Sequence, residues 1–134
     1  MICHIRKKKQ LGQSLVEFAL VLPILLLTIM GVVEFGRIFM TQQVITNASR
    51  EGARAAILPG NTEAEVYETV SSYMSSAGLV SGLSLETSNV GENVQPGTRT
   101  SVTVRYDLPI LTGSIIPGLG ETILLENTTV MRHE

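Results

Sequence analysis

The segment RKKKQLGQSLVEFALVLPILLLTIMGVV, residues 6–33, decides the fold of this chain. It opens with four basic residues and continues into an apolar run from Leu15 to Val33, in which Glu17 is the only charged residue. A helix over those 19 residues rises about 28 Å, close to the ~30 Å hydrocarbon core of a bilayer. The run therefore predicts one transmembrane helix. The basic cluster before it places the N-terminus in the cytoplasm and the rest of the chain outside.

Two residues in this helix are unusual for a simple anchor. Glu17 costs about 2.5–3.5 kcal/mol at the centre of a membrane helix, and less near its end. It is either a carboxylate that reaches the interface or a partner for a positive charge on a neighbouring subunit. Pro23 lacks an N–H and crowds the carbonyl of Ala19, which predicts a kink or a loosened turn. This proline is either an ordinary membrane-helix proline or a functional hinge.

The distribution of charge narrows the classes of partner. Residues 13–134 hold six arginines, no lysine and all twelve acids, so their net charge is 6 − 12 = −6. Nucleic acid is not an expected partner, because phosphate contacts need a basic surface. The single cysteine, Cys3, excludes a disulfide within the chain. No pattern of catalytic residues, metal ligands or cofactor binding stands out, so we expect no enzyme, no metal and no cofactor.

The helical pattern continues from Arg37 to about residue 58, where Pro59-Gly60 stops it. Glu34 and Arg37 stand three residues apart and are expected to form an ion pair at the outward-facing surface of the membrane. Three small residues at four-residue spacing predict close helix packing, either against the chain's own domain or against another subunit: Ala48, Gly52 and Ala56.

The remainder of the chain predicts a small α+β domain. A second helix is capped by Asn61 or Thr62, has Val66, Val70, Ala77 and one of Tyr73 and Met74 on its apolar face, and ends near Gly78. Strands are expected at Leu83–Val90, Arg99–Leu108 and Glu121–Met131. The apolar loop Pro109–Gly120 is either a contact surface or tucked under the sheet. Asn47 and Asn127 each begin an N-glycosylation sequence pattern, and whether either asparagine is modified stays open.

The N-terminal segment also resembles a known family. Gly12, the basic residues before it and Glu17 five positions later resemble the type IV prepilin signal. The wider stretch Gly12–Ile57 is similar to the TadE-like family, the pseudopilins of tight-adherence (Flp) pilus systems. The shared elements are VEFALVLP, EFGR and REGAR, and the final TTVMRHE resembles the family's closing strand.

This resemblance implies cleavage between Gly12 and Gln13 by a prepilin peptidase of the inner membrane. The new α-amine of Gln13 would then pair with Glu17 between adjacent chains. The expected partners are the peptidase, other pilin subunits, the inner-membrane assembly machinery and the lipid membrane. The expected location is the inner membrane, as a single-pass protein, or an extracellular pilus.

The expected organisation is a basic leader (1–12), a transmembrane helix (13–34), an extracytoplasmic helical stalk (35–58) and a C-terminal α+β domain (59–134). Gln13 as the first mature residue, Phe18 after the glutamate and the length of the chain favour a minor pilin. Two alternatives remain at this point: a major, filament-forming pilin, and an uncleaved, membrane-anchored binding domain.

Overall fold

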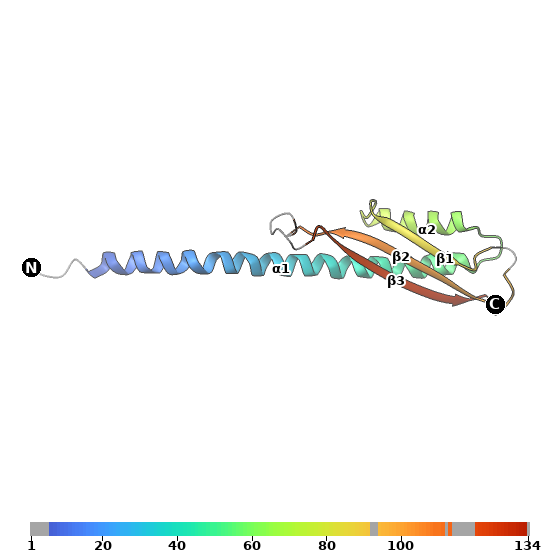
Figure 1. Cartoon of the computed structure of the whole chain (residues 1–134), viewed down its shortest axis with the longest axis horizontal. Helices are drawn as coiled ribbons and strands as arrows, with labels where there is room; N and C mark the ends of the chain where they lie inside the picture. The colour runs from blue at the N-terminus through green and yellow to red at the C-terminus, as the bar shows by residue number, and fades with distance from the viewer. Residues whose placement is uncertain (1–5, 92–93, 112, 114–119, 134) are drawn as a thin grey trace, which may run out of the picture. The chain divides into compact units, whose positions relative to one another are not determined.

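A computed structural model describes residues 6–91, 94–111, 113 and 120–133, with side chains from Gly12 onward. The chain forms helices α1 (Arg6–Ala56) and α2 (Glu63–Ser76), followed by strands β1 (Leu83–Ser88), β2 (Arg99–Pro109) and β3 (Thr122–Arg132) (Figure 1). The predicted α+β fold is therefore confirmed: a long N-terminal helix, one further helix and a three-stranded antiparallel sheet. The contacts divide the chain into two units, residues 1–36 and residues 37–134.

Two predictions concern residues outside the described part of the chain. The leader residue Cys3 precedes it, and residues 112 and 114–119 of the apolar loop fall in two of its gaps. Neither alternative for the loop is therefore decided.

The turn between α1 and α2 follows from local sequence. Pro59 disfavours the helical conformation in the residue before it, and α1 ends just ahead of this point. Asn61 Nδ2 donates to the carbonyl of Ala55 at 2.9 Å and satisfies one group at the end of α1. Thr62 caps α2: its hydroxyl accepts from the N–H of Glu65 at 3.4 Å, and Glu65 Oε2 accepts from the N–H of Thr62 at 2.7 Å. The two candidate caps thus serve different helices.

The sheet is a meander in the order β1-β2-β3. Its register places Val104 of β2 between Leu85 of β1 and Asn127 of β3. Strand β1 ends at Ser88, two residues earlier than predicted, because Asn89 adopts a left-handed φ of 57°. Along β2, alternate residues are buried from Thr100 to Leu108, as the period of two in the sequence predicts.

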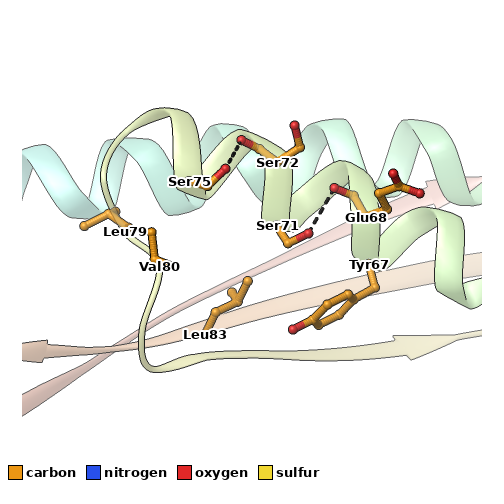
Figure 2. A pocket seen from close by; sticks show the side chains of 8 residues that line it. All are labelled: Tyr67, Glu68, Ser71, Ser72, Ser75, Leu79, Val80 and Leu83. Atoms are coloured by element: carbon orange, nitrogen blue, oxygen red, sulfur yellow. Dashed lines mark hydrogen bonds between the residues drawn. The ribbon is translucent and has the colours of Figure 1, made fainter.

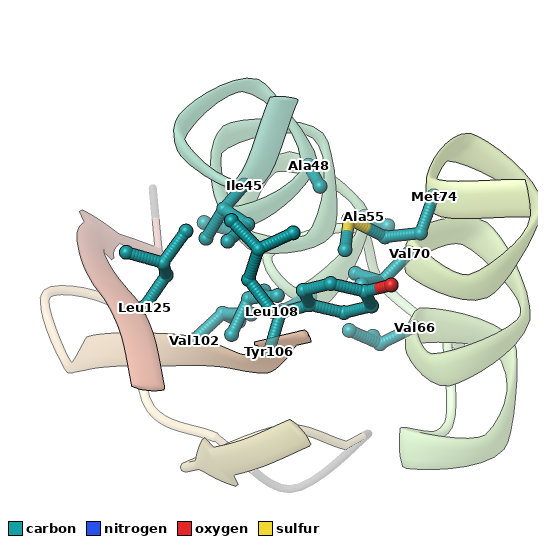
Figure 3. Close-up of a cluster of buried hydrophobic side chains, with 13 residues drawn as sticks. Ile45, Ala48, Ala55, Val66, Val70, Met74, Val102, Tyr106, Leu108 and Leu125 are labelled. Carbon is teal, nitrogen blue, oxygen red and sulfur yellow. The ribbon is translucent and has the colours of Figure 1, made fainter. Parts of the chain in front are cut away.

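The core of residues 37–134 lies between this sheet and two helices (Figure 3). The second half of α1, predicted as a stalk over residues 35–58, contributes directly to it, and Ile45 is fully buried there. On α2, Met74 takes the inward position and Tyr73 is 36% exposed. The apolar side chains that meet in this core include Ile45, Ala48, Ala55, Val66, Val70, Met74, Val102, Tyr106, Leu108 and Leu125.

Candidate functional site

The predicted cleavage site lies inside a helix. Because α1 begins at Arg6, the Gly12–Gln13 bond has helical backbone on both sides. A Cβ built at Gly12 would meet nothing within 4 Å. Glu17 follows Gln13 by four residues, which places both on one face of the helix. Both are exposed, and Glu17 has no hydrogen bond or ion pair with any described residue.

The helix around Glu17 presents an apolar surface on all sides. Every side chain from Gln13 to Ile29 is exposed, including Leu20 at 69%. Among the described residues, α1 is the one helix long and apolar enough to cross a membrane, with a mean hydropathy of 2.5 over 18 residues. So much exposed apolar surface at one end of a chain is typical of a membrane anchor.

Pro23 lies within this apolar part of α1. The helix is continuous on both sides of it, so the proline does not end the element. The next turn is supported by the Thr28 hydroxyl, which donates to the carbonyl of Ile24 at 2.8 Å. The kink expected from the missing N–H stays a prediction.

Glu34 and Arg37 lie where the apolar part of α1 ends. Glu34 is only 8% exposed, which is unusual for a carboxylate. Arg37 Nη2 donates to the carbonyl of Pro109 at 3.4 Å, so the guanidinium contacts the end of β2. The expected pair between Glu34 and Arg37 stays a prediction.

Gly52 lies where α1, α2 and β2 meet. A Cβ built on it would be 2.6 Å from Val70 Cγ2 and 3.1 Å from Val102 Cγ1. Ala48 and Ala56, one turn away on either side, are 0% and 1% exposed. This row of small residues therefore packs inside the domain of residues 37–134 and lets the two helices approach the sheet closely.

A partly buried polar cluster joins α1 to β3. Asn127 Nδ2 donates to the hydroxyl of Ser49 at 2.6 Å, and the hydroxyls of Ser49 and Thr129 are 2.8 Å apart. Ser49 Oγ donates in turn to the carbonyl of Thr46 at 2.9 Å. Ser49 is fully buried, so these bonds replace the water that its hydroxyl loses.

Sequence reasoning missed this cluster, although α1 carries a signal for it. Gln42, Thr46 and Ser49 stand at i, i+4 and i+7, which makes a polar stripe on the helix. Gln42 Nε2 extends the contact by donating to the carbonyl of Glu126 at 3.2 Å. The nitrogen that glycosylation of Asn127 would modify is thus already bonded, whereas Asn47 is exposed.

The opposite face of the sheet is mostly polar, although Leu124 and Val130 of β3 are exposed on it. Arg105 Nε donates to Glu126 Oε2 at 2.6 Å, and Arg105 also pairs with Glu86 across the other strand. The hydrogen bonds to Glu126 and then to Glu86 raise the pKa of Arg105. Hydroxyl pairs continue the pattern, with Thr103 and Thr128 2.8 Å apart. Such cross-strand pairs support the register of the sheet.

The described residues contain no candidate metal site. Within these ranges, no three His, Cys, Asp or Glu side chains come together in a way that could hold a metal ion. What the described part of the chain does present is an exposed apolar helix with one carboxylate, and a folded domain.

Comparison with known families bears on this arrangement. Residues 12–54 match the family model described as "TadE-like protein". This segment of the chain is TadE-like. The match begins at the predicted cleavage site and includes Glu17, Pro23 and the buried row up to Gly52, so the resemblance seen in the sequence is confirmed over these residues. Neither the curated proteins nor the solved structures gave a significant match. The family suggests a protein associated with the tight-adherence pilus, and it is not known for enzymatic activity.

Proposed function

We propose that this chain is a minor pilin, or pseudopilin, that takes part in assembly of a tight-adherence pilus after a prepilin peptidase cleaves it behind Gly12. One observation carries the proposal: the TadE-like segment starts at Gly12 and holds Glu17 on an exposed apolar helix. An anchor needs no carboxylate there, whereas an assembling subunit needs a specific contact in an otherwise uniform apolar surface.

Cleavage would reverse the charge pattern at the start of α1. It removes four basic residues, Arg6 to Lys9, and leaves the α-amine of Gln13 as the new helix start. The N-terminus of a helix carries the positive end of the helix dipole, which favours an acid such as Glu17 in the first turns. In surroundings of low dielectric constant, the attraction between amine and carboxylate becomes stronger than in water.

The amine that pairs with Glu17 belongs to the neighbouring subunit in this proposal. Within one chain Gln13 and Glu17 are also at helical spacing, so the chain's own amine competes for the carboxylate. A neighbour shifted along the helix axis can replace it, and the pairing then sets the axial offset between subunits. Pro23 gives the packed helices a place to bend. Glu34 and Arg37 mark the extracytoplasmic boundary of the inner membrane, and residues 37–134 lie outside the cytoplasm.

The proposal is tested by separating processing from assembly. A Glu17→Ala variant should still lose its leader but should fail to co-isolate with sheared pili or to cross-link to other pilus subunits in the membrane. Glu51→Ala is the matched control, because Glu51 is an exposed acid on the same helix without a partner among the described residues. Normal assembly of Glu17→Ala would rule out the charge pairing, and failure of both variants would show a general defect.

A further inference from the structure

Strand β1 has one edge that is not hydrogen-bonded. The N–H of Asp107 donates to the carbonyl of Gly82 at 3.1 Å, which identifies Gly82 and Asp107 as a hydrogen-bonded pair of the antiparallel ladder. Bonded and non-bonded pairs alternate along such a ladder, so the backbone groups of Leu83, Leu85 and Thr87 point away from β2. In the described part of the chain, nothing bonds to them. A free edge of this kind is a template for a further strand.

A groove of about 430 Å³ lies beside this edge, between β1 and α2. Figure 2 shows the ring of Tyr67 reaching down from α2 toward β1, with Leu83 next to it and Val80 farther along, on the loop that leads into β1. These side chains are apolar but accessible: Tyr67 is 49% and Val80 74% exposed. Ser71 adds a hydroxyl to the wall formed by α2. An open edge and an apolar groove together fit an extended peptide, with main-chain bonds on one side and pockets for alternate side chains.

The charges at the groove are all negative. Glu68 lines it and has no ion-pair partner among the residues described. Glu63, at the start of α2, contacts β1 through Oε1, which accepts from the hydroxyl of Thr87 at 3.2 Å. No lysine or arginine is found among the described residues that line the groove. A second copy of this chain is a poor occupant, because residues 13–134 contain no lysine and carry a net charge of −6.

We propose that this groove binds an extended segment of another protein, which adds to β1 as a fourth strand. Every second residue of this segment faces α2, and these α2-facing residues include both apolar and basic ones. The apolar side chains of the segment contact Tyr67, Val80 and Leu83, and its basic side chains reach Glu68 and Glu63. The backbone groups of Leu83, Leu85 and Thr87 supply the hydrogen bonds. This site does not depend on cleavage after Gly12 or on Glu17.

The test uses the full-length chain in nanodiscs of zwitterionic lipid and a short fluorescent valine-lysine peptide with threonine between these residues (valine-threonine-lysine-threonine, repeated), so that valine and lysine lie on the same face of the strand. Fluorescence anisotropy should show saturable binding. A peptide with glutamate in place of lysine should bind at least about tenfold more weakly, and so should the valine-lysine peptide N-methylated at the amides that face β1. Absence of binding, or equal binding of the methylated peptide, would overturn the proposal.

Two protein variants locate the site. Thr87→Pro removes an N–H from the free edge of β1, where proline is tolerated in an edge strand. Thr128→Pro is the control, because it removes an N–H from the outer edge of β3. The Ile110 N–H donates to the carbonyl of Glu121, and bonded pairs alternate from there along the ladder. The backbone groups of Asn127 and Thr129 therefore point toward β2, and those of Thr128 point away from it. Binding should fall at least about tenfold in the first variant and stay unchanged in the second. Equal binding by the two variants would contradict a site on β1. If circular dichroism shows that either variant is unfolded, the proposal is tested by the binding of the methylated peptide to the wild-type chain.

Discussion

Gly52 and Val70 approach so closely that the space between α1 and α2 cannot hold a methyl group: a Cβ on Gly52 would be 2.6 Å from Val70 Cγ2. The second contact of that Cβ, at 3.1 Å, is Val102 Cγ1 of β2. One glycine thus sets the distance between the long helix and the rest of the domain. Since this glycine also falls in the TadE-like segment, the segment contributes to the fold of the domain as well as to the apolar helix.

We predict that Gly52→Ala destabilises the domain. Overpacking costs about 1–3 kcal/mol, and the better helix propensity of alanine returns about 1 kcal/mol. Gly36→Ala is the control in the same helix, because a Cβ there meets nothing within 4 Å, and it should be neutral or stabilising. Thermal unfolding followed by circular dichroism compares the two. Equal stability of both variants would show that the close contact does not exist in solution.

A second test of this contact uses Val70. Because Val70→Ala opens the space that a methyl group on Gly52 needs, its cost should be smaller in the Gly52→Ala background than in the wild type. A double-mutant cycle measures the difference. Strictly additive costs would contradict a direct contact between residues 52 and 70.

We predict that Ser49→Ala lowers the free energy of unfolding by about 1–3 kcal/mol, because it leaves the amide of Asn127 and the hydroxyl of Thr129 without their shared partner. Ser75→Ala is the control. Its hydroxyl is exposed and donates only to the carbonyl of Ser72 within its own helix, so the change should stay within about 0.5 kcal/mol. Chemical denaturation of both variants gives the comparison. A Ser49→Ala variant as stable as the control would show that the cluster does not hold β3 on α1.

We predict that the pairing of Arg105 with Glu86 and Glu126 contributes a stability that salt weakens, since all three side chains are solvent-accessible. The pKa of Arg105 is raised in the folded chain. The stability that the charged guanidinium contributes is therefore complete at any pH below its pKa in the unfolded chain, and it is lost only as the pH rises through its pKa in the folded chain. The guanidinium therefore stays charged at neutral and mildly alkaline pH. The stability difference between wild type and Arg105→Met should be constant over that range and should shrink with added salt. A difference that falls between neutral and mildly alkaline pH would contradict this interpretation.

Local patterns predicted much of this structure. The alternation of Val102, Val104, Tyr106 and Leu108 with polar residues indicated which face of β2 is buried. Pro59-Gly60 marked the break between the helices. Both signals act within a few residues of the feature they determine. Tyr73 and Met74 could not be separated in this way, because adjacent residues lie only about 100° apart on a helix and both bordered the apolar face.

Contacts between distant residues were not predictable from the sequence. Ser49 and Asn127 are 78 positions apart, and their hydrogen bond depends on how β3 lies along α1. The small row at Ala48, Gly52 and Ala56 indicated close packing but not its partner, because small residues suit a neighbouring subunit as well as the chain's own sheet. The free edge of β1 likewise follows from the strand order, which the sequence pattern does not determine.

We predict that Gly12→Ala slows removal of the leader. Peptidases act on extended backbone, and in the structure the Gly12–Gln13 bond is helical. Alanine stabilises a helix by about 1 kcal/mol relative to glycine, which lowers the unwound population about fivefold. Gly31→Ala, in the same helix but remote from the bond, should be processed at the wild-type rate. Pulse-chase labelling measures both rates. Identical rates for the two variants would argue against unwinding at Gly12.

The central claim is that this chain becomes an assembling subunit by losing its leader. The N-terminal residue of the membrane-extracted protein, determined by mass spectrometry, tests this most directly. In cells that possess a prepilin peptidase the chain should begin at Gln13, and in cells that lack the peptidase it should retain the basic residues Arg6 to Lys9. A chain that keeps these residues in the presence of the peptidase would contradict the account.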